Sequence, residues 1–325
     1  MIVTFGEAMI RLTPPDHRRL VQAYTLDVEI GGAELNTAVG IAQLGHPVRW
    51  VSRLLDAPMG HLIANRTQEA GVDTRFIQWT STGRVGVYYL EVGASPRPSR
   101  IFYDRAESAI AQIQPGMLPW SEIFRDQRYF YVTGITAALS KGAAEAVLEA
   151  LKAARQAGLT TVLDPNYRSK LWSVEDAAAW LQQAIHHVDV LVSNPEDIER
   201  FFNVKASEVE AGARETATRY SLKAVALTLR ETPSVWRNTI SALVFADGTS
   251  YHGPTVEVEI VDRLGTGDAF VSGLFHGMIQ NNWQRAVDYG VACAAIKHTI
   301  QGDLPWLELS EVDDLLQGGG MRIRR

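Results

Sequence analysis

A short glycine-containing stretch, residues 262–268 (DRLGTGD), holds the residues best suited to chemistry. It lies between a strand-like run, residues 255–261, and a helical run, residues 269–280. Two glycines allow a tight turn, and successive backbone N–H groups at a helix start bind anions such as phosphate. The carboxylate beside this turn, Asp268, could accept the proton of a hydroxyl that attacks the phosphorus. Taken alone, the motif fits equally well a simple strand-to-helix turn in which Asp268 caps the helix.

A second glycine motif, residues 31–36 (GGAELN), opens another helical run. The glycine pair lets a ligand approach the backbone, and Asn36 in the first turn can direct its side-chain amide toward that ligand. The chain has neither a Gly-x-x-x-x-Gly-Lys-Ser/Thr loop nor a Gly-x-Gly-x-x-Gly motif between a strand and a helix. P-loop NTPases and dinucleotide-dependent reductases are therefore excluded.

The elements that must position these motifs alternate between short β-branched runs and longer runs of helical periodicity. This alternation is typical of a parallel sheet covered by helices. One helix is predicted from Lys141, capped by Ser140 and ended by Gly158, and others begin at Ser173 and Pro195. The predicted strands are residues 2–6, 47–53, 129–134, 159–164, 189–193, 223–230, 241–245 and 249–252, and residues 33–44 form a further helix.

The runs at residues 11–29, 73–79, 84–92 and 97–105 have another character. They are strand-like, lack helical periodicity and are separated by Gly and Pro turns. We interpret them as a small antiparallel sheet inserted into the α/β domain, and as a candidate lid. The predicted division is an α/β domain of residues 1–10, 31–72 and 106–325, and a lid of residues 11–30 and 73–105.

The two glycine motifs and the order of the elements between them resemble the ribokinase-like (PfkB) family of carbohydrate kinases. Residues 31–36, 102–105, 164–168 with 171–172, and 297–303 are most similar to those of 2-keto-3-deoxygluconate kinases. The resemblance covers nearly the whole chain. It implies a doubly wound, mostly parallel sheet with helices on both faces and an inserted β-sheet lid. The activity it implies is transfer of the γ-phosphate of ATP, with Mg²⁺, to the 6-hydroxyl of 2-keto-3-deoxygluconate.

The resemblance also assigns roles to individual residues. The catalytic base falls on Asp268, and the anion hole falls on the backbone of Gly265, Thr266 and Gly267. Sugar contacts are expected at Gly32, Asn36, Tyr88, Tyr103, Arg105 and Arg168, and nucleotide contacts at Asn194, Thr228, Arg230, Gly265 and Gly267.

The two sugar-site arginines agree with an acidic substrate. A sugar acid carries a carboxylate, for which an arginine offers two parallel donors. Without the resemblance, Arg168 would be interpreted as a surface cation after a Pro-Asn turn. Arg105 would be interpreted as a charge that protects an edge strand.

Three positions depart from the family pattern. Thr266 replaces the usual alanine and keeps the backbone donors. Residues 194–197 (NPED) resemble an Asn-x-x-Glu motif that organises magnesium through water, but place the shorter Asp197 at the acidic position. The nucleotide loop at residues 231–238 (ETPSVWRN) is bulkier than the usual glycine loop, which leaves the nucleotide open. Arg263 could contact phosphate or remain solvated.

Composition limits the partners and the compartment. A net charge of −6 without long charge blocks argues against nucleic acid and anionic membranes, so small molecules, a sugar acid and ATP, are the expected partners. A single cysteine, Cys293, and the early Glu7 favour a reducing cytoplasm without an export signal. No apolar run reaches the roughly 18 residues of a spanning helix. An apolar face formed by Val85, Val87 and Tyr89 suggests a homodimer through the lid.

Two rival functions stay open. A kinase for a neutral sugar such as fructose or ribose would not need the tyrosines and arginines of the sugar site. A non-catalytic sugar or nucleotide sensor on the same fold would not need Asp268. The preference between the gluco and galacto epimers is also open.

Overall fold

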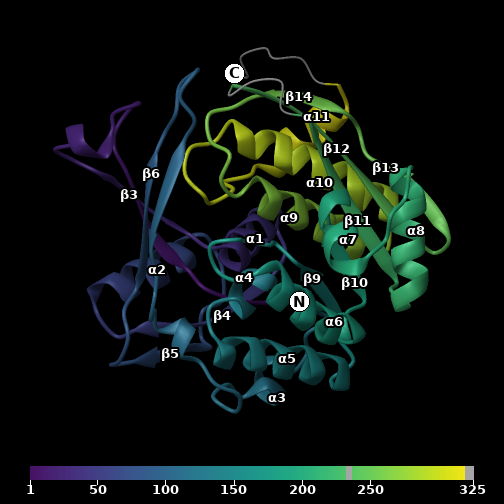
Figure 1. Cartoon of the computed structure of the whole chain (residues 1–325), viewed down its shortest axis with the longest axis horizontal. Helices are drawn as coiled ribbons and strands as arrows, with labels where there is room; N and C mark the ends of the chain where they lie inside the picture. Colours follow the sequence, from purple (N-terminus) through teal and green to yellow (C-terminus); the bar gives the residue numbers. More distant parts are fainter. Residues whose placement is uncertain (232–235, 319–325) are drawn as a thin grey trace.

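The computed structural model describes residues 1–231 and 236–318, and its centre is a ten-stranded sheet (Figure 1). The strand order is β13-β12-β11-β10-β9-β8-β1-β4-β5, and β14 pairs with β12. Neighbours from β11 to β5 are parallel, whereas β12 pairs antiparallel with β11, β13 and β14. The bounds are β1 Ile2–Phe5, β4 Val48–Leu55, β5 Ile77–Thr80, β8 Tyr129–Thr133, β9 Thr160–Asp164, β10 Val190–Ser193, β11 Ala224–Glu231, β12 Arg237–Ala246, β13 Thr249–His252 and β14 Val256–Glu259.

The sheet is doubly wound, as predicted. From β1 the chain proceeds outward through β4 and β5, and then returns to β8 and proceeds the other way through β9, β10 and β11. Every residue of β8 and of β10 is buried, because strands of a parallel sheet are covered on both faces. Ligands of such sheets bind beyond the carboxyl ends of the strands near the point where the winding reverses.

Helices cover both faces of the sheet. One hydrophobic core packs α1, α9 and α10 on the sheet, and the other packs α5, α6, α7 and α8 on the opposite face. The helices are α1 Ala33–Gln43, α2 Pro58–Glu69, α3 Trp120–Ile123, α4 Gly134–Ala137, α5 Lys141–Gln156, α6 Val174–Ala184, α7 Pro195–Phe202, α8 Val209–Tyr220, α9 Thr266–Ile279, α10 Trp283–His298 and α11 Leu309–Leu316. Short 3₁₀ turns are η1 Leu20–Gln22, η2 Ile110–Gln112 and η3 Ile185–His187. None of the helices in the described residues has the length and apolar character needed to span a bilayer.

Helix α5 shows how local sequence sets these boundaries. The Ser140 hydroxyl oxygen accepts a hydrogen bond from the backbone N–H of Ala143 at 3.0 Å, which satisfies a first-turn donor. Gly158 follows the helix with φ of +79°, a conformation that glycine adopts without strain. Both predicted boundary residues of this helix are confirmed.

A second, four-stranded sheet stands apart from the helical layers at the left of Figure 1. Its order is β3 (Asp27–Gly31), β2 (Met9–Thr13), β6 (Gly86–Glu91) and β7 (Arg100–Asp104). The predicted small sheet is confirmed, but its fully antiparallel pairing is wrong, because β2 and β6 run parallel.

The predicted membership of residues 73–79 in this small sheet is also wrong. Strand β5 pairs in parallel with β4, with Ser52 opposite Ile77, and so extends the large sheet. The reason is the intervening helix α2, because a strand, helix and strand in succession usually form a parallel crossover unit.

The small sheet has two unlike faces. Arg11, Tyr88 and Tyr103 lie opposite one another on adjacent strands and share one face. Leu12, Tyr89 and Phe102, the residues next to them, form a row on the other face. Arg11 and Tyr88 are buried, and Arg11 contacts Asp262 and Asp303, so the first face is turned toward the large domain. Tyr103, on the edge strand β7, is as exposed as Phe102 on the other face.

Candidate active site

Two cavities lie at the carboxyl ends of the parallel strands. The larger, of about 680 Å³, is lined by the ends of β9, β10 and β11 and by the turn at residues 263–268. The smaller, of about 90 Å³, lies between this turn and the small sheet. Arg168, Leu264, Gly265 and Asp268 line both cavities. Asp268 therefore stands where two ligands would meet.

The glycine turn before α9 has a conformation that requires Gly265. This residue is the N-cap of α9 with φ of +77°, and a Cβ atom added to it would collide with the carbonyl oxygen of Asp303. The first backbone N–H groups of a helix have no carbonyl partner within the helix. Since Gly265, Thr266 and Gly267 all line the larger cavity, this helix start is suited to hold an anion there.

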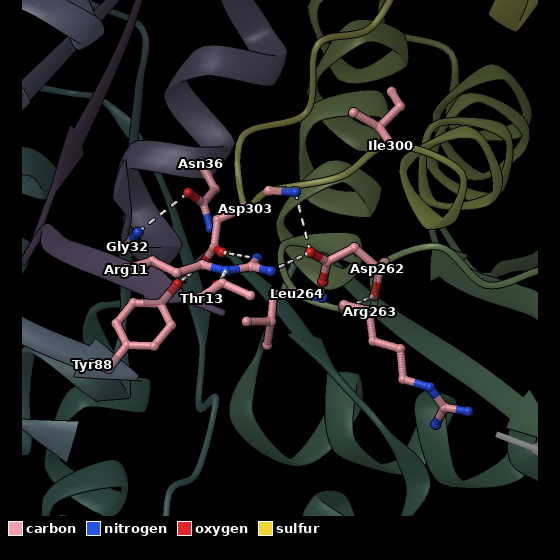
Figure 2. Close-up of polar contacts among 12 residues, drawn as sticks. Arg11, Thr13, Gly32, Asn36, Tyr88, Asp262, Arg263, Leu264, Ile300 and Asp303 are labelled. Carbon is pink, nitrogen blue, oxygen red and sulfur yellow. Dashed lines mark hydrogen bonds and ion pairs between the residues drawn. The ribbon is translucent and has the colours of Figure 1, made fainter. Parts of the chain in front are cut away.

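The two glycine motifs predicted from the sequence meet in the structure. Asn36 Nδ2 donates a hydrogen bond of 2.7 Å to Asp268 Oδ2. Asn36 Oδ1 accepts one of 3.2 Å from the backbone N–H of Gly32 (Figure 2). Burial raises the pKa of Asp268 to about 6, and the hydrogen bond from Asn36 opposes that rise. At neutral pH Asp268 is a carboxylate that accepts protons more readily than an exposed aspartate.

All six residues predicted to contact sugar line the smaller cavity: Gly32, Asn36, Tyr88, Tyr103, Arg105 and Arg168. Two of them, Tyr88 and Arg105, pair with buried carboxylates of the protein. The Tyr88 hydroxyl donates to Asp303, and Arg105 forms an ion pair with the buried Glu7. Glu7 lines the same cavity and also accepts a hydrogen bond of 2.6 Å from the Ser108 hydroxyl.

Arg168 differs from Arg105 in its surroundings. It is exposed, and its Nη1 donates at 3.2 Å to the carbonyl oxygen of the adjacent Tyr167. An arginine has five N–H donors, so this bond leaves most of them available to a ligand.

The predicted nucleotide residues Asn194, Thr228, Arg230, Gly265 and Gly267 line the larger cavity. The surrounding protein partly desolvates the Arg230 guanidinium, which lowers its pKa, and its Nη2 lies 3.4 Å from the hydroxyl of Thr266. Arg263 lines this cavity too, and its side chain extends away from Asp262 in Figure 2. The predicted nucleotide loop at residues 231–238 lies partly outside the described residues, because residues 232–235 are not included.

Carboxylates face the same cavity, but Asp197 is not among them. The Asp197 side chain accepts hydrogen bonds of 2.9 Å from Asn194 and 3.0 Å from Arg200. Asp164 and Glu196 line the cavity instead, and burial raises the pKa of Asp164 to about 7. Asp164 and Glu196 therefore present carboxylate oxygens, which Mg²⁺ prefers as ligands, to this cavity, whereas Asp197 does not line it. The adjacent acidic residues Glu196 and Asp197 gave no signal in the sequence as to which one faces the ligand.

A cluster of buried charges beneath the turn was missed by the sequence analysis. Arg11 of β2 contacts the carboxylates of Asp262 and Asp303 (Figure 2). The side chain of Lys297 is buried and interacts electrostatically with the same three residues. The sequence signals were the place of Asp262 at the start of the glycine motif and the resemblance of residues 297–303, which include Lys297 and Asp303, but neither indicated that these residues meet Arg11.

Comparisons with known proteins agree with this geometry. The profile of the pfkB family carbohydrate kinases matches residues 1–305. A 2-dehydro-3-deoxygalactonokinase of Haloferax volcanii is 38% identical over 100% of this chain and 99% of its own. The crystal structure of a 2-dehydro-3-deoxygluconokinase from Thermotoga maritima is 38% identical, has a TM-score of 0.94, and each chain is covered to 98%. A fructokinase from Xylella fastidiosa with bound ATP shares the fold, with a TM-score of 0.81, 24% identity and 98% coverage of each chain.

Proposed function

The chain belongs to the pfkB family of carbohydrate kinases, and we propose that it transfers the γ-phosphate of ATP to the 6-hydroxyl of 2-keto-3-deoxygluconate. The 2-dehydro-3-deoxy acids in the names of its relatives are the same class of 2-keto-3-deoxy sugar acid. The named epimers differ between a relative and a solved structure of equal identity, so the galacto epimer is the second candidate substrate.

The position of Asp268 between the two cavities carries the proposal. The smaller cavity takes the sugar acid beneath the small sheet, and the larger takes ATP with its phosphates at the turn of residues 265–267. A hydroxyl that reaches from the smaller cavity toward the turn must pass Asp268. The acceptor, the base and the anion hole are then next to one another, as an in-line phosphoryl transfer requires.

In the proposed reaction the carboxylate of Asp268 orients the 6-hydroxyl and accepts its proton. The sugar oxygen forms a bond to the γ-phosphorus while the bond from that phosphorus to the β–γ bridging oxygen breaks, and ADP leaves. Asn36 holds the base in place, and the backbone N–H groups of the turn stabilise the charge on the transferring group. Asp164 and Glu196 would hold the Mg²⁺ that accompanies ATP. The positive charge of this ion would offset the negative charge of the phosphates.

Selection for an acid is assigned to the arginines of the sugar cavity. Arg168 supplies donors that the protein does not use, and Arg105 adds positive charge that Glu7 already balances in part. A carboxylate that leaves water needs charged donors to offset its lost hydration. We therefore assign the substrate carboxylate mainly to Arg168.

A panel of acceptors tests the proposal directly. The purified protein is incubated with ATP, Mg²⁺ and each of 2-keto-3-deoxygluconate, 2-keto-3-deoxygalactonate, fructose and ribose, and ADP release is measured. We expect the two sugar acids to give much higher kcat/KM than the neutral sugars. Preference for fructose or ribose would establish the neutral-sugar kinase instead. Binding of a sugar without any turnover would establish a sensor.

A further inference from the structure

Four buried charges lie directly beneath the glycine turn. Arg11 is 1% exposed and Lys297 is 0% exposed, and the carboxylates of Asp262 and Asp303 are buried with them. Two positive and two negative charges balance one another, which a buried cluster requires. Arg11 is the one member of this group that comes from the small sheet, and the other three belong to the large domain.

The guanidinium group of Arg11 bridges two separate segments of the large domain. Its Nη2 lies 2.7 Å from Asp262 Oδ2, and its Nη1 donates to Asp303 Oδ1 at 2.8 Å (Figure 2). Its Nε donates at 2.9 Å to the Thr13 hydroxyl on the same strand, which fixes the plane of the group. A planar fork held at three points sets a defined geometry, which a lysine could not reproduce.

Both partners of Arg11 shape the anion-binding turn. Asp262 accepts hydrogen bonds from the backbone N–H groups of Leu264, at 3.0 Å, and Gly302, at 3.1 Å. Leu264 directly precedes Gly265, and the carbonyl oxygen of Asp303 lies against the α-carbon of Gly265. The carboxylates that Arg11 holds therefore define where the turn lies.

The residue opposite Arg11 on the neighbouring strand lines the smaller cavity, which is the proposed sugar site. Arg11 is in register with Tyr88 of β6, which lines that cavity and donates its hydroxyl proton to the second oxygen of Asp303. Strand β2 thus contacts the phosphate-binding turn through Arg11 and the sugar-binding face through its neighbour.

We propose that Arg11 is a positioning residue for phosphoryl transfer, which holds the anion-hole turn at a fixed place relative to the sugar-bearing face of the small sheet. The inference rests on the proposed function. Arg11 touches neither substrate and acts through Asp262 and Asp303. Its loss displaces the turn amides from the transferring phosphoryl group, and a displacement of about 1 Å costs about 100-fold in rate.

The test compares Arg11→Met with Arg84→Met. Arg84 also pairs with an aspartate of the small sheet, Asp104, but this ion pair is exposed and lines neither cavity. Three quantities are measured for each variant: hydrogen exchange of residues 262–268 without ligands, the Kd of the sugar acid by calorimetry, and kcat. For Arg11→Met we expect about tenfold faster exchange in the turn. We expect a kcat lowered about 10- to 100-fold and a Kd within about threefold of the wild-type value. Arg84→Met leaves all three unchanged.

Two further variants keep the test decisive if Arg11→Met does not fold. Asp262→Asn removes the charge that Arg11 contacts but keeps an acceptor for Leu264, and Arg11→Lys keeps a charge without the fork. Both should lower kcat more than they raise Kd. Combining Asp262→Asn with Arg11→Lys should lower kcat by less than the product of the two single effects, since both act on one link.

The outcomes separate the two proposals. Unchanged exchange in the turn, or faster exchange with normal kcat, overturns the positioning role. If the wild-type protein phosphorylates no sugar, the proposed function and the positioning role fail together. The exchange data then show only whether the contacts of Arg11 with Asp262 and Asp303 stabilise the turn.

Discussion

In the proposed reaction the chemistry depends most on Asp268, which is the one carboxylate among the described residues that lines both cavities and which accepts a hydrogen bond from Asn36. Asp268→Asn preserves the side-chain shape and one acceptor but removes the base. We expect kcat to fall by about 10² to 10⁴ while the Kd of the sugar acid and the melting temperature stay close to the wild-type values. Steady-state kinetics, calorimetry and a thermal melt check this. Near-normal turnover would remove Asp268 from the mechanism.

The pH dependence of kcat should report on the same carboxylate. Asp268 acts as a base only when it is deprotonated, and its pKa is raised to about 6, so kcat should fall as the pH drops below about 6. The hydrogen bond from Asn36 stabilises the charged form, and its removal in Asn36→Ala should therefore move this acid limb to higher pH. Profiles of kcat against pH for both proteins decide the point. If the acid limb of the profile stays at the same pH in Asn36→Ala, another group, such as Asp164, is responsible for it.

The two sugar-cavity arginines should behave differently on removal. Arg168 is exposed, so Arg168→Ala should keep the fold and raise KM for the sugar acid about tenfold or more, with KM for ATP less affected. Arg168→Lys should recover part of the loss. Arg105→Ala leaves the buried Glu7 without its ion-pair partner and should also lower the melting temperature. If neither variant changes the preference for sugar acids over fructose, both arginines are structural.

Site residues that lie in glycine motifs could be predicted from the sequence. Residues outside any motif that pair with distant parts of the chain, such as Arg11, could not. Asp268 and Asn36 are marked by neighbouring glycines, because a ligand-binding turn needs a particular backbone. Arg11 has no such neighbours. Its partners Asp262 and Asp303 are more than 250 residues away in the chain, and only the folded structure brings them within reach. The side chain that faces the ligand in the 194–197 motif was likewise decided by helix packing and not by residue type.

Among the elements, the turn before α9 is predicted to be the least tolerant of change. Gly265→Ala adds a Cβ atom both at a positive φ and against the Asp303 carbonyl group. We expect about 100-fold lower kcat, since the anion hole must move. Gly45→Ala is the matched control, with φ of +81° and no atom within 4 Å of the added carbon. It should lower the free energy of unfolding by about 1 to 2 kcal/mol without changing kcat. Equal effects of the two substitutions on kcat would contradict this account.

The small sheet should respond to sugar as a lid. It contacts the large domain through one face, and Tyr88, Tyr103 and Arg105 lead from it into the smaller cavity. We expect saturating sugar acid to slow hydrogen exchange over residues 84–105, while residues of helix α5 exchange as before. Exchange that is indifferent to sugar over residues 84–105 would argue against closure.

Strand β5 shows that a sequence pattern can predict a strand without identifying the strand with which it pairs. Its four residues predict a strand from composition, and this is confirmed as Ile77–Thr80. A short strand, however, does not reveal its partner, which depends on the path of the chain around it. Helix α2 carries the chain back parallel to β4, and the exposed position of β5 at the sheet edge explains its mixed polarity.

At the scale of the molecule, the outer face of the small sheet is the proposed contact of a homodimer. Val28 is 52% exposed and Phe102 40%, and the nearby Tyr24 is 97% exposed. Val85, which the sequence assigned to this face, is buried, whereas Val87 and Tyr89 are half-buried. Val28 and Phe102 lie in one row across the sheet with Leu12 and Tyr89, and exposed apolar side chains on one sheet face support an interaction site there.

Light scattering tests the dimer. We expect a wild-type mass of twice the chain mass and a monomer for Phe102→Asp. Met59→Asp is the control, because Met59 is also an exposed apolar residue but lies on α2. A wild-type monomer, or a dimer that survives Phe102→Asp, would exclude this face as the contact.

The hydrogen bond between Asn36 and Asp268 and the ion pair between Arg11 and Asp303 join residues 232 and 292 positions apart in the chain. During synthesis the first partner of each pair leaves the ribosome long before the second exists. The proposed reacting centre can therefore form only after residue 303 has been synthesised. Contacts of such long sequence separation also form slowly, because the intervening chain must be ordered first. In a nascent chain the large sheet should thus form long before the chain has kinase activity. A chain truncated before residue 303 should have no kinase activity.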